Sequence, residues 1–158
     1  SEGATRVQEG HNVHQHLDLI AGLPYEDYDS FGKSFCDVYQ LRPQQLQLGF
    51  LKVLKGSYMY EHASEYGLIY RTKPPYEVLA SKWVSYDEML EIRLVEEMLE
   101  LHYNSGQFLT YLAVLEQRYA SAFQMFLDMG HFYRSNGYLD SSHNRVKCLL
   151  FGYEITHS

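Results

Sequence analysis

The chain has 158 residues, of which 46% are hydrophobic and 21% charged, as expected for one folded domain or two small ones packed together. Its net charge of −7, without any cluster of Lys or Arg, argues against binding to nucleic acid or to an anionic membrane. The sequence has no run of the roughly 20 apolar residues that cross a bilayer. These features predict a cytoplasmic protein.

The first third of the chain is predicted to form a strand, a helix and a second strand. Residues 13–22 alternate as a strand does, and Pro24 prevents its extension. Residues 27–40 place apolar side chains three or four apart, which indicates one buried helix face. Residues 46–54 form the second strand. This βαβ unit would have parallel strands, and because a lone unit leaves sheet edges and one face bare, it should belong to a larger parallel sheet or barrel.

The remaining residues are predicted to be mainly helical. A short helix over 57–66 precedes a small hairpin made by residues 68–71 and 76–80. Ser85 and Glu88 form a capping box that begins a helix ending near Tyr103. Three more helices are expected over residues 107–119, 122–136 and 142–155. The predicted fold is therefore α+β and mainly α, with a boundary that separates residues 1–56 from a helical domain over residues 57–158.

The first strand has two faces of opposite character. One face carries Val13, Leu17, Leu19 and Ala21, and the other carries His14, His16, Asp18, Ile20 and Gly22. A parallel strand that is buried on both faces does not tolerate such a polar row unless the row lines a site. In a barrel of parallel strands the polar row would point into the lumen, and ligands bind at the carboxyl ends of those strands.

The segment Asp18-Leu19-Ile20-Ala21-Gly22-Leu23-Pro24-Tyr25-Glu26 resembles a late-strand motif of radical-SAM enzymes, Asp-x-Ile-x-Gly-x-Pro-x-Glu. The resemblance implies that the βαβ unit is the remnant of that family's partial TIM barrel. It also implies that Ile20 and Gly22 lie along the nucleoside of S-adenosylmethionine. His16, Asp18 and Gln47 are then the candidate residues on the substrate side.

Residues 45–56 resemble the last barrel strand of one radical-SAM subgroup, which carries an N-terminal cobalamin-binding domain. Its members are described as similar to the anaerobic magnesium-protoporphyrin IX monomethyl ester oxidative cyclase. Residues 66–79 and 103–108 resemble parts of that subgroup's C-terminal domain, whose function is unknown. The resemblance covers about residues 14–150. It implies that the parent enzyme uses a 4Fe–4S cluster, S-adenosylmethionine and cobalamin.

The chain departs from the family in its cysteines. Radical-SAM chemistry requires a C-x-x-x-C-x-x-C loop, whose three thiolates hold the cluster. Only Cys36 and Cys148 are present, and both are predicted to be buried, reduced thiols. The sequence therefore predicts a C-terminal fragment that is inactive alone, holds no cofactor itself, and has the rest of its parent chain as its partner. No catalytic residue is assigned within it.

Two alternatives remain. His11, His14 and His16 suggest a metal site, but no further ligand is identifiable, so none is predicted. The 15 tyrosines suggest a non-catalytic helical interaction module, for example one that forms a homodimer through its Tyr-rich faces. Trp83 is interpreted as a core anchor rather than a stacking platform.

Overall fold

The computed structural model describes residues 4–8, 15–139 and 144–157. The chain divides into two compact units, residues 1–92 and residues 93–158. The architecture is α+β and mainly helical, as predicted. Within the described ranges, no helix has the length and apolar character needed to cross a membrane. The predicted domain boundary between residues 56 and 57 stays a prediction.

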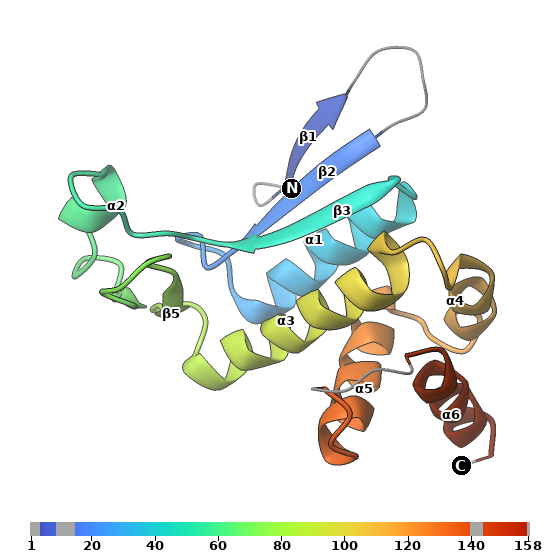
Figure 1. The fold of residues 1–158 in the computed structure, drawn as a ribbon. Coiled ribbons are helices and arrows are strands. Elements are labelled where there is room, and N and C mark those ends of the chain that lie inside the picture. Colours follow the sequence, from blue (N-terminus) through green and yellow to red (C-terminus); the bar gives the residue numbers. More distant parts are fainter. Residues whose placement is uncertain (1–3, 9–14, 140–143, 158) are drawn as a thin grey trace. The chain divides into compact units, whose positions relative to one another are not determined.

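The first unit is built on a three-stranded sheet with the order β1–β2–β3. Strands β2 (Gln15–Ala21) and β3 (Gln45–Phe50) are parallel and are joined by α1 (Tyr28–Gln40), which confirms the predicted βαβ unit. Strand β1 (Ala4–Gln8), which was not predicted, pairs antiparallel with β2. Figure 1 shows α1 lying along one face of this sheet.

The core of the first unit lies between this helix and the sheet. The buried side of β2 carries Leu17, Leu19 and Ala21, and α1 contributes Phe31 and Phe35, all nearly inaccessible to solvent. Each of the buried leucine and phenylalanine side chains contributes about 1.5–3 kcal/mol of transfer free energy. The helix begins where the Asp27 carboxylate accepts a hydrogen bond from the Ser30 N–H at 2.8 Å.

The chain after β3 departs from the predicted strand. The strand ends at Phe50 because the backbone beyond it pairs with a different segment: the Val53 N–H donates to the Tyr76 carbonyl, and the Val78 N–H donates to the Leu51 carbonyl. The following helix α2 (Tyr58–Glu61) is shorter than predicted, since turns replace it up to Gly67. Strands β4 (Ile69–Tyr70) and β5 (Val78–Ala80) form the expected antiparallel hairpin.

Helix α3 (Tyr86–Leu99) begins with the predicted capping box, in which Glu88 N–H donates to Ser85 Oγ and Ser85 N–H donates to Glu88 Oε1. The predicted continuation to Tyr103 is not α-helical. Instead, η1 (Glu100–Asn104) is a π-helix, a rare form in which the backbone bonds span five residues. The predicted break at Ser105 and Gly106 follows it.

The second unit contains α4 (Leu109–Glu116), α5 (Ala122–Ser135) and α6 (Asn144–His157). The predicted start of the last helix, at Ser142, lies outside the described residues. Two glycines allow close packing: a Cβ on Gly130 would lie 3.0 Å from the Leu94 Cβ, and a Cβ on Gly152 would overlap the Tyr111 hydroxyl. That hydroxyl donates to the Cys148 carbonyl at 3.0 Å.

His102 lies on η1 and is completely inaccessible to solvent. Neither ring nitrogen has a hydrogen-bond partner. Its ring meets Phe108 and Tyr133 in edge-to-face contacts, with centroid distances of 5.0 and 5.4 Å. This apolar burial lowers the pKa of His102 from 6.5 to about 4, because a buried imidazolium would lose its hydration.

Candidate functional site

The residues predicted to face a site lie side by side on the sheet. In the parallel register, His16 is paired with Gln45, Asp18 with Gln47, and Ile20 with Gly49. Paired residues of neighbouring strands point to the same face. The structure therefore brings His16, Asp18, Ile20 and Gln47 together on one face of the βαβ unit.

This face is the more open of the two. The intervening residues Leu17 and Leu19 are buried, whereas Asp18 and Ile20 are half-buried and His16 is exposed. On β3, Gln47 is likewise exposed between Leu46 and Leu48, which are buried. In Figure 1, none of the helices described within residues 1–92 covers the face opposite α1.

Gly22, directly after β2, has a backbone φ of +96°. This left-handed conformation strongly favours glycine. The position that a Cβ would occupy there faces Met89, Val78 and Leu51 at 3.4–3.6 Å, so that side of the glycine is packed against protein. The backbone thus requires a glycine at this turn, and the predicted nucleoside contact stays a prediction.

Gly49 was not singled out from the sequence. It lies beside Ile20 in the register, and a Cβ at Gly49 would lie 3.4 Å from the Ile20 Cδ1. The Ile20 side chain is therefore the one that any side chain at position 49 would meet first. The only signal available in the sequence was a glycine inside a strand, which often marks a close approach of ligand or backbone.

A hydrogen bond of Glu26, the last residue of the motif, joins the loop after Gly22 to α1. Glu26 is buried, and its Oε2 accepts a long hydrogen bond of 3.4 Å from the Ser34 hydroxyl. Asp27 then caps the helix. The loop at the carboxyl end of β2 therefore has a defined position relative to the sheet.

An aromatic cluster made by Tyr25, Tyr58, His62, Tyr66 and Trp83 adjoins this loop. The Tyr25 ring lies 4.7 Å from Trp83 and 6.0 Å from Tyr66, and His62 stacks on Tyr58 at 3.8 Å. The Tyr58 and Tyr66 hydroxyls are 3.2 Å apart, and this hydrogen bond is the main reason that the pKa of Tyr66 is raised to about 12.

Two members of the aromatic cluster are strongly exposed: 74% of Tyr25 and 58% of Tyr58 is accessible. Tyr25 also has a φ of +68°, which is unfavourable for a residue with a Cβ. Trp83 is half-buried and contacts Tyr25 and Tyr66, so it is a ring of this cluster rather than the core anchor that was predicted. The cluster was not predicted because Tyr25 and Trp83 lie far in the chain from residues 58–66, which they contact.

The cysteines do not fit the ligand set of an iron–sulfur cluster. Cys148 is buried, and desolvation raises the pKa of its thiol to about 12, so it remains protonated rather than becoming the thiolate that binds metal. Cys36 lies on α1 and is half-buried. Among the described residues, no three His, Cys, Asp or Glu side chains are grouped to hold a metal ion. His11 and His14 lie outside the described residues.

Comparison with known proteins gives one family match. The family model described as "Protein of unknown function (DUF4080)" matches residues 64–152, which is more than half of the chain. No curated protein matches the sequence. The chain therefore belongs to the DUF4080 family, in agreement with the predicted C-terminal domain of unknown function.

Proposed function

We propose that this DUF4080-family chain is the C-terminal part of a radical-SAM enzyme of the cobalamin-binding kind. In this proposal β2 and β3 are the last two strands of its barrel, and the helical residues cap that barrel. The edge of β2 that the antiparallel β1 occupies in this chain pairs instead with the preceding parallel strand of the parent barrel. DUF4080 is a domain found C-terminal in radical-SAM and cobalamin proteins, which supports the assignment. The observation that carries it is the parallel βαβ unit with one polar face.

The polar face suits the lumen of a barrel better than it suits a second hydrophobic layer. Ile20 supplies a half-buried apolar side chain beside Gly49, and in this proposal the flat adenine ring lies against it. We assign Ile20 and the Gly22 turn to the nucleoside of S-adenosylmethionine. When bound in the parent enzyme, a reduced cluster and S-adenosylmethionine would supply the radical chemistry needed for hydrogen abstraction from a substrate.

The substrate side is assigned to His16, Asp18 and Gln47. An ionised Asp18 accepts hydrogen bonds and would anchor a donor group of the substrate. The ring nitrogens of His16 can donate or accept a hydrogen bond. Gln47 pairs with Asp18 in the register and adds an amide that both donates and accepts. The cluster ligands must come from other residues of the parent chain, which is thus the partner of this chain.

The experiment uses the full polypeptide encoded by the reading frame that contains this chain, purified and reconstituted without oxygen. We expect a three-cysteine loop upstream, a bound 4Fe–4S cluster and reductive formation of 5′-deoxyadenosine. Asp18→Asn should impair substrate turnover more than 5′-deoxyadenosine formation. Asp29→Asn, the same change at an exposed position on α1, is the matched control. An upstream frame without such a loop, or a reconstituted enzyme that forms no 5′-deoxyadenosine, would overturn the assignment.

The second candidate function is an interaction module that forms a homodimer, and the exposed rings of the aromatic cluster favour it. A surface of this kind buries large apolar area when a partner covers it. Analytical ultracentrifugation of the 158-residue chain tests it directly. A dimer that Tyr25→Ser converts to monomer would support this candidate, and a monomer at high micromolar concentration would exclude it.

A further inference from the structure

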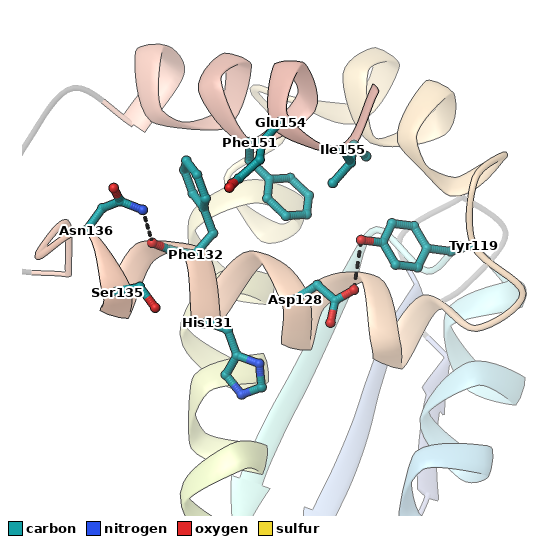
Figure 2. A pocket seen from close by; sticks show the side chains of 9 residues that line it. All are labelled: Tyr119, Asp128, His131, Phe132, Ser135, Asn136, Phe151, Glu154 and Ile155. Atoms are coloured by element: carbon teal, nitrogen blue, oxygen red, sulfur yellow. Dashed lines mark hydrogen bonds between the residues drawn. The ribbon is translucent and has the colours of Figure 1, made fainter. Parts of the chain in front are cut away.

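A groove of about 400 Å³ lies within the second unit, between α5 and α6. Its walls are Tyr119, side chains of α5 between Asp128 and Ser135, Asn136 at the end of that helix, and side chains of α6 between Phe151 and Ile155 (Figure 2). This volume falls in the range that holds small organic ligands. None of the residues that line the groove belongs to the polar face of the sheet or has a role in the proposed radical-SAM function.

One part of the groove is apolar. Phe132 and Phe151 meet edge to face with a centroid distance of 5.6 Å. Figure 2 shows Phe151 and Ile155 projecting from α6 toward the groove. Phe151 is 2% exposed and supports the wall from behind, whereas the half-buried Phe132 and Ile155 present its accessible apolar surface. A hydrocarbon or aromatic body would find a preformed wall here.

The other part of the groove is acidic. The Tyr119 hydroxyl donates to Asp128 Oδ2 at 3.0 Å, and Gln124 Nε2 donates to Asp128 Oδ1 at 2.7 Å. These two donors orient the carboxylate, which has about four acceptor positions and so retains some for a ligand. Burial, followed by the hydrogen bond with Asp128, raises the pKa of Tyr119 well above its usual value, so its hydroxyl stays a donor.

A second carboxylate, Glu154, lines the groove from α6 and is exposed. None of the described residues that line the groove is Lys or Arg, and the lining includes the imidazole of His131. The two carboxylates therefore give the groove a negative potential that no neighbouring lysine or arginine in its wall neutralises. A cation is the ligand that complements this charge.

We propose that the groove binds a small organic amine in its protonated form. The ammonium group donates to Asp128 and is attracted by Glu154, while the apolar body of the amine lies against Phe132 and Ile155. An ammonium beside aromatic faces gains further attraction from their quadrupoles. The chemical class is thus an arylalkyl or alkyl amine with a single positive charge.

The test is a titration of the 158-residue chain by calorimetry and by amide NMR. The three probes each carry a phenyl ring on a short chain and differ in the charge of the terminal group: 2-phenylethylamine, neutral 2-phenylethanol and anionic phenylacetate. We expect saturable binding of the amine, with NMR shifts in α5 and α6, and at least tenfold weaker binding of the alcohol and the acid. Equal binding of the amine and the alcohol would overturn the proposal, as would an amine that does not saturate the chain at millimolar concentration.

Variants distinguish specific binding in the groove from a general attraction of the amine to a negatively charged protein. Asp128→Asn and Glu154→Gln should each weaken amine binding at least threefold. Glu154→Gln alters an exposed side chain, so it keeps the test valid should Asp128→Asn fail to fold. Asp87→Asn removes the same charge from an exposed position in the first unit and should leave the affinity unchanged. An equal loss of affinity in all three variants would refute a specific site.

Discussion

The buried imidazole of His102 predicts a specific loss of stability in acid. Burial lowers its pKa to about 4, whereas the same group titrates near 6.5 in the unfolded chain. Between these two values the unfolded state binds a proton that the folded state does not. The stabilising contribution is therefore complete above pH 6.5 and is lost as the pH falls from 6.5 toward 4.

The size of the loss follows from the difference in pKa. At 1.36 kcal/mol for each pKa unit, the neutral His102 contributes about 3 kcal/mol at pH 7 that is absent near pH 4. The neighbouring Tyr133 does not titrate in this range, because burial raises its pKa above the usual value. A loss of this size is a large fraction of the free energy of unfolding of a small domain.

The assay is urea unfolding of the 158-residue chain, followed by helical circular dichroism at several pH values from 4 to 8. His102→Leu removes the ionising group and, since neither ring nitrogen has a partner, breaks no hydrogen bond. The wild-type chain should lose about 3 kcal/mol more than the variant between pH 7 and pH 4. All other titrating groups are common to the two proteins. If the free energies of unfolding of the two proteins fell in parallel with pH, His102 would not be the cause and the reasoning would be refuted.

Three further substitutions test the packing and the turns. Gly152→Ala should cost about 1–3 kcal/mol, because the new Cβ displaces the Tyr111 hydroxyl from its buried acceptor, and an unchanged urea midpoint would contradict this. Ser85→Ala should cost about 1 kcal/mol in thermal unfolding through loss of the capping box, whereas Ser85→Thr should retain most of the stability. Gly22→Ala should cost about 1–2 kcal/mol from backbone strain alone, since the surrounding side chains leave room. A much larger cost would mean that the packing around Gly22 is tighter than the distances indicate.

The elements that the sequence predicted well are those with a strong local signal. The alternation around Leu17 and Leu19 identified β2, and the three-or-four spacing of Phe31 and Phe35 identified α1. The reciprocal hydrogen bonds at Ser85 depend on residues only three apart, so the motif alone was sufficient. In each case the deciding interactions are within one element or follow directly from its periodicity.

The features that were missed depend on contacts between distant residues. Nothing local distinguishes a π-helix at Glu100–Asn104 from the α-helix before it. The ring contact of Tyr25 with Trp83 joins positions on either side of β3, α2 and the hairpin. The groove between α5 and α6 is equally invisible in the sequence, because it exists only once the two helices are packed.

The exposure pattern of β2 and β3 provides the remaining link between the fold and the proposed chemistry. A parallel strand that packs beneath helices on both sides is apolar at nearly every position. Here each apolar residue that is buried against α1 alternates with a half-buried or exposed one, as in Leu17–Asp18–Leu19 and Leu46–Gln47–Leu48. A second hydrophobic layer over Asp18 and Gln47 would leave a carboxylate and an amide without water, at a cost of several kcal/mol. Anything that covers this face must therefore be polar or leave room for solvent or a ligand, and the lumen of the proposed barrel meets that requirement.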